Sequence, residues 1–272
     1  MILRTAKVWA RIVDDYKPLP ENKRGPGRAL TPEQEKQLFE IAASNPRWDA
    51  AYFAAQLAAN TTARSCELKG LRLADIDLIG RTMTVRRATT KTDAGCRVIP
   101  LNQAPTWALA RLAQRAQLLG ASKTEHYLFP TFRFRQTRAG QRTNGSGYDP
   151  TSPMRSWRTA WRNLTRAIQC PACRQLQPPG TICSNDACKA DIRSMKSLTA
   201  GLRFHDLRHH CITRLAEAGV PEQTLMAIAG HVSREMLEHY SHIRMQAKRD
   251  AVAALEPTTV PAREQQASLP VN

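Results

Sequence analysis

The chain has 272 residues, and its 40 Lys and Arg against 23 Asp and Glu give a formal net charge of +17. A hydrophobic fraction of 42% is enough to build a core, so the composition excludes a wholly disordered chain. The sequence pI of about 10.2 indicates a polyanionic partner, although charge alone does not separate DNA, RNA and an anionic membrane surface.

The N-terminal stretch carries neither a membrane span nor a secretory signal. The opening "MILRTAKVWARIVDDY" is interrupted by Arg4, Lys7 and Arg11, and it lacks a small-residue cleavage site. We therefore expect no membrane contact and a cytoplasmic location, where the seven cysteines are mostly reduced.

The first predicted elements are helices. Residues 1–16 favour a helix because apolar residues recur mostly at steps of three or four, and a linker rich in Pro, Gly and cations follows. The motif "TPEQ" predicts a helix start, in which Thr31 caps, Pro32 occupies the first turn and Gln34 reaches back. A second helix is expected over about 47–60.

The middle of the chain changes its period. Segment 63–77 predicts a short helix that closes near Gly70, followed by a turn. Segment 81–101 alternates apolar residues with threonines around a "KTDAG" turn, which predicts a small antiparallel sheet. Helical periodicity returns over 104–119 and 153–168. Together these elements predict a mainly α fold with a small antiparallel β-sheet (α+β).

The predicted helix over 153–168 has two distinct faces. One is an apolar seam, formed by Met154, Trp157, Trp161, Leu164 and Ile168. The other is a basic stripe, formed by Arg155, Arg158, Arg162 and Arg166. This stripe is either a solvated face or a set of phosphate contacts. The preceding segment 131–150 is polar, basic and glycine-bearing, and we expect a surface loop there.

Four cysteines lie close together in "CPACRQLQPPGTICSNDAC". They form two close pairs, Cys170 with Cys173 and Cys183 with Cys188. This spacing is typical of a tetrahedral four-thiolate zinc knuckle, and the competing interpretations are an incidental reduced thiol cluster, an iron–sulfur site or a redox pair. The remaining cysteines are expected to be ordinary buried small residues: Cys66, Cys96 and Cys211.

The stretch "FHDLRHH" concentrates cations on one helix. His205 and Arg208 are three residues apart, so they share a helix face that we expect to point outward. Gly230 ends a later helix in "AGHVS", where His231 opens the next turn, and Tyr240 follows nine residues further on. Taken singly, each of these residues is uninformative.

In order and context, the pattern resembles the tyrosine recombinase, or phage integrase, family. Its signature is an Arg in "R-x-x-E-L", a Lys on a β-hairpin, "H-x-L-R-H", "G-H" and a Tyr about nine residues later. The resemblance covers roughly residues 30–255. The matching residues are Arg64, Lys91, His205, Arg208, His231 and Tyr240.

The resemblance implies that Tyr240 attacks a DNA phosphodiester and leaves a 3′-phosphotyrosyl link and a free 5′-hydroxyl. Phenol has a pKa near 10, so only about 0.1% is ionised at pH 7 and the site must assist deprotonation. No metal is implied for catalysis. Fixed cations must therefore neutralise the negative charge that grows on the phosphoryl oxygens. The guanidinium groups of Arg64 and Arg208 suit this role.

The resemblance also assigns the other three residues and the partners. His205 would accept the tyrosine proton or hold the phosphate, His231 would bond a non-bridging oxygen, and Lys91 would protonate the leaving 5′-oxygen. The implied partner is double-stranded DNA, bound by a homo-tetramer, with accessory DNA-bending proteins possible and a location at the nucleoid.

The family pattern predicts how the chain is divided. Residues 1–29 would be a remnant helix of a truncated core-binding domain plus a linker, and residues 30–256 would form the catalytic domain. Residues 169–197 would be an inserted zinc-knuckle-like segment, and residues 257–272 a flexible tail. The expected function is a site-specific recombinase or integrase of a mobile element. The alternatives are a catalytically idle DNA-binding remnant and a type IB topoisomerase-like enzyme that relaxes DNA.

Overall fold

The fold is described from a computed structural model of the chain. The structure describes residues 27–90, 95–136, 142–230 and 252. The predicted helix over 1–16, the tail over 257–272 and the candidate residues Lys91, His231 and Tyr240 lie outside the described residues. Within the described part, no helix is both long enough and apolar enough to cross a membrane.

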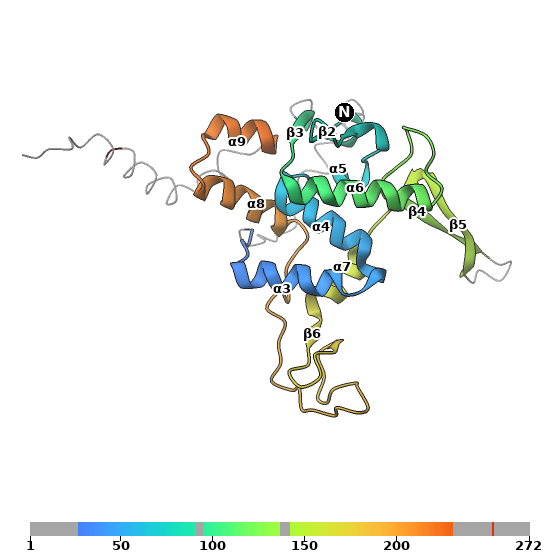
Figure 1. Cartoon of the computed structure of the whole chain (residues 1–272), viewed down its shortest axis with the longest axis vertical. Coiled ribbons are helices and arrows are strands. Elements are labelled where there is room, and N and C mark those ends of the chain that lie inside the picture. The colour runs from blue at the N-terminus through green and yellow to red at the C-terminus, as the bar shows by residue number, and fades with distance from the viewer. Residues whose placement is uncertain (1–26, 91–94, 137–141, 231–251, 253–272) are drawn as a thin grey trace, which may run out of the picture.

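The body is a cluster of helices around α4 (Asp49–Thr61), which contacts α3 (Pro32–Ala43), α6 (Gln103–Leu118) and α8 (Asp206–Glu217) (Figure 1). Alanines dominate the buried face of α4, so its neighbours approach closely. The remaining helices of the described residues are α5 (Ser65–Lys69), α7 (Arg158–Arg166) and α9 (Glu222–Ala229), with single 3₁₀ turns at Pro46–Trp48, Leu73–Asp75 and Arg87–Thr89.

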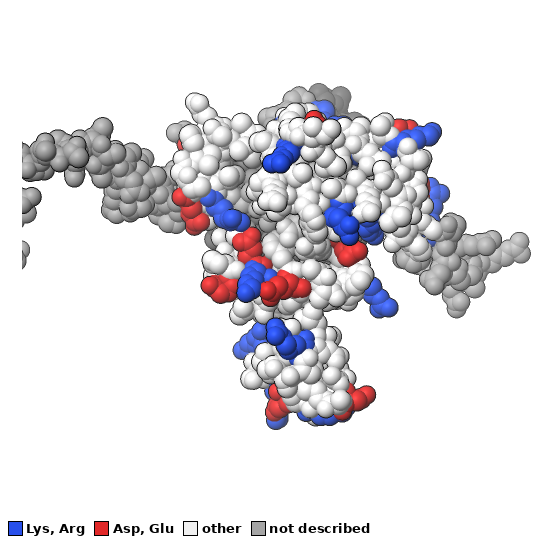
Figure 2. Space-filling view, in the orientation of Figure 1, with Lys and Arg blue, Asp and Glu red and all other residues white. Residues whose placement is uncertain are grey.

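The predicted start of α3 is confirmed. The Thr31 hydroxyl accepts a hydrogen bond from the Gln34 backbone N–H at 3.3 Å, and the Gln34 side chain accepts from the Thr31 N–H at 3.1 Å. Figure 2 shows acidic and basic side chains side by side over α3. Lys36 and Glu40 of this helix form an exposed ion pair with an N–O distance of 4.0 Å. This face of α3 is thus solvated, while its opposite face packs on α4.

The predicted sheet is present, with one strand more than expected. Strands β1 (Ile76–Asp77), β2 (Thr82–Val85) and β3 (Arg97–Pro100) run antiparallel in that order. Met83 lies opposite Ile99, and both are fully buried. The strand β1 has two residues, which is too short to show a period of two in the sequence.

The prediction of a surface loop over 131–150 is wrong. This segment forms an antiparallel hairpin of β4 (Pro130–Gln136) and β5 (Arg142–Pro153), which extends from the body (Figure 1). Phe132 packs edge-to-face on Tyr148 across the strands, with ring centroids 5.1 Å apart, and Arg133 pairs with Asp149. Cross-strand pairs therefore stabilise this hairpin, although the glycines and arginines of the segment hide any alternation of apolar and polar residues in the sequence. Because β5 runs to Pro153, the helix predicted over 153–168 begins only at Arg158.

The cysteine-bearing insert projects from the body below α3 and α7 (Figure 1). It contains a two-stranded ribbon of β6 (Ile168–Gln169) and β7 (Leu176–Gln177). Its return to the body is fixed at Thr165, whose carbonyl accepts hydrogen bonds from the hydroxyls of Ser197 at 2.7 Å and Thr199 at 3.2 Å. These bonds hold the end of the insert against α7.

Candidate functional site

Arg64 lies at the start of α5, as predicted, and is held there by Glu67. The Glu67 carboxylate accepts from the backbone N–H of Arg64 at 2.8 Å and from its guanidinium at 2.8 Å. The Arg64 side chain is 31% exposed, whereas that of Glu67 is only 1% exposed. The buried carboxylate therefore fixes the direction of a guanidinium that solvent, or a ligand, can still reach.

Glu67 also binds a second cation, Arg97 at the start of β3. Their closest N–O distance is 2.9 Å, and the side chain of Arg97 is 5% exposed. Burial alone would raise the pKa of Glu67, but hydrogen bonds from Arg97 and from the backbone of Arg64 lower it overall. The carboxylate is therefore ionised at neutral pH and neutralises part of a charge-dense junction.

Arg97 connects this junction to two other elements. Its Nε donates to the carbonyl of Ile228 at 2.8 Å, and one Nη donates to the carbonyl of Gly95 at 2.8 Å. Ile228 is in the last turn of α9, and Gly95 follows the undescribed residues 91–94. Sequence reasoning missed Arg97, because a single Arg at the start of a strand carries no motif.

Arg208 is buried, and the expectation that it shares an outward face with His205 is wrong in this respect. The residue is only 2% exposed. One Nη donates to the carbonyl of Thr62, and the other donates to the carbonyl of Ala229 at 2.9 Å. Thr62 ends α4 with φ at 57°, in the left-handed region, and this conformation sets the direction of its carbonyl.

Burial lowers the pKa of Arg208 to about 10, and the positive charges of Arg64 and Arg97 act in the same direction. The guanidinium still carries its charge at pH 7. A guanidinium has five N–H donors, and the two carbonyls use only part of them. Arg208 can therefore hold the fold and still offer donors to an anion.

His205 precedes α8 and is exposed, in contrast to Arg208. Its ring meets that of His209 edge-on, with centroids 5.1 Å apart. Partial burial of the imidazole is the largest cause that lowers the pKa of His205 to about 4, and the charges of His209 and Arg208 add to it. Solvent screens part of these effects, but their direction leaves a neutral imidazole at pH 7.

The end of α9 is held by side chains from three other elements. The carbonyls of Ile228 and Ala229 accept from Arg97 and Arg208, and the Thr62 hydroxyl donates to Ile228 at 3.1 Å. Cations are favourable at a helix C-terminus, where the free carbonyls carry partial negative charge. Gly230 then turns the chain with φ at 70°, a conformation that favours glycine. This fixed turn leads directly to His231.

The structure thus brings Arg64, His205 and Arg208 close enough for the charges of both arginines to act on the imidazole. Lys91 lies outside the described residues, between Thr90 and Gly95. A Cβ at Gly95 would lie 2.6 Å from that of Thr90, so the two ends of the undescribed stretch are in contact. His231 and Tyr240 follow the fixed end of α9 and are likewise outside the described residues.

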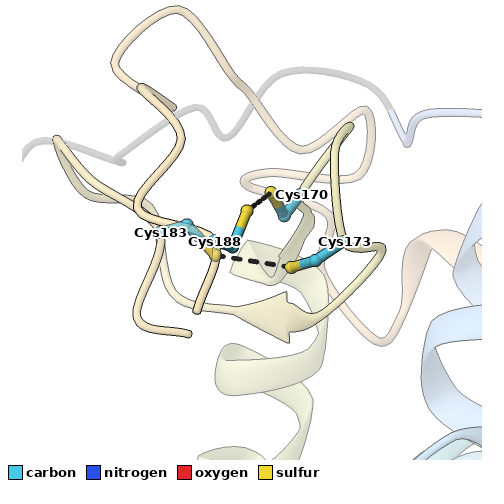
Figure 3. A group of neighbouring side chains, drawn as sticks. All are labelled: Cys170, Cys173, Cys183 and Cys188. Carbon is cyan, nitrogen blue, oxygen red and sulfur yellow. Dashed lines mark hydrogen bonds between the residues drawn. The ribbon is translucent and has the colours of Figure 1, made fainter. Parts of the chain in front are cut away.

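The four cysteines of the insert meet at one point (Figure 3). The Sγ atoms of Cys170 and Cys188 are 3.8 Å apart, those of Cys173 and Cys183 are 3.6 Å apart, and all four lie within 4.8 Å of one another. These separations are too long for a disulfide, which needs about 2.05 Å. They fit a tetrahedron with metal–sulfur bonds of about 2.3 Å, whose edges are about 3.8 Å.

Backbone donors surround these sulfur atoms. The N–H groups of Cys173 and Ala172 lower the pKa of Cys170 to about 7, and the N–H of Asn185 donates to Cys183 at 3.5 Å. Such bonds stabilise thiolates in metal centres. The small apolar cluster of the insert consists of Ile168 and Ile192 packed with the four cysteines, with Ala190 and Met195 partly buried against them, so the cysteines form much of its core.

The other cysteines do not all match the prediction. Cys211 is buried in α8, but Cys66 and Cys96 are exposed. The prediction that these two are buried is therefore wrong. Cys66 lies in the first turn of α5, where its neighbours Glu67 and Leu68 occupy the two buried positions of the short helix.

Solved structures with the same fold define the class of the domain. The chain is similar to the Tn1549 transposon integrase in complex with transposon right end DNA, with 21% identity, a TM-score of 0.55, and coverage of 92% of this chain and 76% of that one. It is similar to XerA recombinase, with 18% identity, a TM-score of 0.50, and coverage of 94% and 75%. The fold is that of tyrosine recombinase catalytic domains.

Sequence comparison then gives the family. Residues 28–167 and 179–247 match the phage integrase family, and the chain belongs to that family. The match stops at Ala167 and resumes at Pro179, so the first cysteine pair of the insert falls in the gap. A comparison with curated protein sequences gave no match.

Proposed function

We propose that this protein is a site-specific DNA recombinase or integrase of a mobile element, which cuts and rejoins double-stranded DNA through a phosphotyrosyl intermediate at Tyr240. The observation that supports the proposal is that the positive charges of Arg208 and Arg64 both lower the pKa of the exposed imidazole of His205, so these three candidate residues lie near one another. Arg64 and Arg97 share the single carboxylate of Glu67, and Arg208 donates to backbone carbonyls, so these cations are suited to an anion such as a DNA phosphate.

In the proposed step, the Tyr240 oxygen attacks phosphorus and forms a 3′-phosphotyrosyl bond, and its proton passes to His205. The bond from phosphorus to the 5′-oxygen breaks, and Lys91 supplies the proton to the leaving oxygen. Arg64 and Arg208 neutralise the charge on the non-bridging oxygens, with His231 as a further donor. Rejoining is the reverse of these transfers, so no external energy source is needed.

Two alternatives use the same residues differently. A type IB topoisomerase-like enzyme would relax supercoiled DNA through the same intermediate, and an idle remnant would only bind DNA. The charged junction at Glu67 favours an enzyme over a remnant, since it holds Arg64 in a fixed direction that binding alone does not require. A homo-tetramer on DNA, with accessory DNA-bending proteins, belongs to the same proposal.

The proposal is tested by trapping the covalent intermediate. Incubation with a nicked suicide duplex, which loses its 5′-hydroxyl strand after cleavage, is expected to give a protein–DNA adduct stable in SDS. Tyr240→Phe should abolish the adduct because it removes the nucleophilic oxygen, and Tyr52→Phe serves as the matched control. An adduct that persists in Tyr240→Phe would assign the nucleophile elsewhere, and its absence from the wild type at saturating DNA would favour the idle remnant.

We further propose that the four-cysteine cluster is a structural zinc site. The residues that would hold the ion are Cys170, Cys173, Cys183 and Cys188, and their sulfur separations fit a closed tetrahedron. The ion would organise the insert and take no part in cleavage. A structural zinc contributes on the order of 10 kcal/mol to a small domain, which suits an insert with so little apolar core.

Protein purified without chelator is expected to contain one equivalent of zinc. Cys173→Ser should lower the zinc content below half an equivalent and expose the insert to protease, while the helical body still unfolds cooperatively. Cys96→Ser, at an exposed cysteine outside the cluster, should change neither property. Zinc-free wild-type protein with a protease-resistant insert would contradict the proposal.

A further inference from the structure

The two cysteine turns of the insert end in backbone conformations that disfavour their residues. Arg174 follows Cys173 with φ at 60°, and Lys189 follows Cys188 with φ at 49°. Glycine adopts this left-handed conformation without penalty, whereas a residue with a Cβ loses stability there. A strained residue at such a turn is a reason to look for a task of its side chain.

Arg174 lies on the wall of a groove between the insert and the body. The groove has a volume of about 790 Å³ and is lined by Trp48, by Asn163 and Arg166 of α7, and by Arg174 and Gln177 of the insert. None of its lining residues is acidic. The groove therefore favours an anionic occupant that can also accept hydrogen bonds from side-chain amides and guanidinium groups.

Gln177 gives an independent indication of a missing acceptor. The residue is 5% exposed, and its Oε1 accepts from the backbone N–H of Ser184 at 2.7 Å, which fixes the orientation of the amide. Its Nε2 is buried and has no hydrogen-bond partner. Buried donors without partners are rare, and each costs stability unless a ligand or water supplies an acceptor.

The basic stripe of α7 leads to this groove. Arg158, Arg162 and Arg166 are exposed at successive helical turns, and Arg155 precedes them in the chain. Among the described ion pairs, none involves these four arginines or Arg174. On the face shown in Figure 2, basic side chains gather where the insert meets the body, whereas both signs occur at its far end.

We propose that the groove between the insert and α7 binds the phosphate backbone of DNA outside the cleavage site, with Arg174 and Arg166 as its phosphate contacts. This inference rests on the proposed function and adds a second duplex contact to it. The arginines of α7 then form a row of phosphate contacts that runs from the body to the insert. The turn after Cys173 places Arg174 at the end of this row, next to the DNA backbone. A duplex backbone fits the run of regularly spaced cations better than a single small anion does.

The test compares variants that keep the turn but remove the charge. Arg174→Gly and Arg174→Asn both accept a left-handed backbone, so the zinc content and the thermal midpoint should stay equal or rise. The affinity for a labelled duplex, measured by fluorescence anisotropy, should fall roughly five-fold, and the slope of log Kd against log salt should decrease by about 0.9 per lost phosphate contact. Arg166→Ala should lower the affinity and the salt slope by similar amounts. The double variant Arg174→Gly/Arg166→Ala should show the loss of both contacts.

Lys189→Gly is the matched control. It relieves the same conformation in the other turn, but its ammonium pairs with Asp186, so the affinity and the salt slope should not change.

The outcomes separate this inference from the proposed function. If the wild type binds and cleaves duplex but Arg174→Gly and Arg166→Ala keep its affinity and salt slope, the groove is not a DNA contact and the cleavage proposal stands. If those variants bind DNA normally but lose binding to an acidic peptide, the groove belongs to a protein partner. If the wild type binds no duplex at all, both proposals fall.

Discussion

Arg208→Ala is expected to lower the rate of DNA cleavage on the order of 10³-fold, because it removes a fixed guanidinium from the proposed phosphate site. It should also destabilise the protein by about 3 kcal/mol, since the carbonyls of Thr62 and Ala229 lose their buried donor. In a domain of this size the thermal midpoint should drop by about 10 °C. Single-turnover cleavage of a suicide duplex and a calorimetric scan measure the two effects.

Arg208→Lys separates the two roles of this side chain. An ammonium keeps the positive charge but cannot bridge two carbonyls and a phosphate at once. We expect it to recover part of the lost stability and little of the cleavage rate. DNA affinity at low temperature should change much less than the rate in both variants. Equal losses in DNA affinity and cleavage rate would mean that Arg208 contributes only to DNA binding. Full recovery of cleavage in Arg208→Lys would contradict the role of the guanidinium as a planar, bidentate donor.

Glu67→Gln is expected to cost about 3 kcal/mol of folding stability at pH 7, because a buried carboxylate is lost from between Arg64 and Arg97. The pKa of Glu67 is lowered in the folded state from its ordinary value of 4.5. Its stabilising contribution is therefore complete above about pH 4.5 and is lost as the pH falls below that value towards the lowered pKa. The difference in thermal midpoint between the wild type and the variant should therefore become smaller as the pH falls below about 4.5.

Glu40→Gln provides the control for this experiment. Glu40 faces solvent on α3 and pairs with Lys36 at 4.0 Å, so its loss should change the midpoint by little at any pH. A midpoint difference for Glu67→Gln that stays constant between pH 7 and pH 3.5 would show that folding does not lower the pKa of Glu67. Cleavage should also weaken in Glu67→Gln, since Arg64 loses the partner that sets its direction.

The sequence predicted those elements whose signals are local. The capping pair Thr31 and Gln34 marks the start of α3, and the alternation over 81–101 marks β2 and β3. The hairpin of β4 and β5 was missed because its stability comes from pairs across the strands, such as Phe132 with Tyr148, which no single strand reveals. Strand β1 was missed because two residues cannot display a period.

The candidate residues could be selected from the sequence, but the contacts that each of them makes could not. The order of Arg64, His205 and Arg208 follows the family pattern, whereas the burial of Arg208 depends on carbonyls from Thr62 and Ala229, which lie far from it in the chain. Arg97 has no signal at all in a single sequence. Buried cations need partners, and the identity of those partners becomes visible only in three dimensions.

Arg208 links the proposed phosphate site to the C-terminal end of α9, because the same guanidinium serves both. A phosphate that attracts the guanidinium of Arg208 would also weaken its hydrogen bond to the carbonyl of Ala229, one residue before the turn at Gly230. Any such movement would shift the C-terminal end of α9, where the described residues stop before His231. Under the proposed function, binding of a DNA phosphate at Arg208 would thus be coupled to the position of the end of α9.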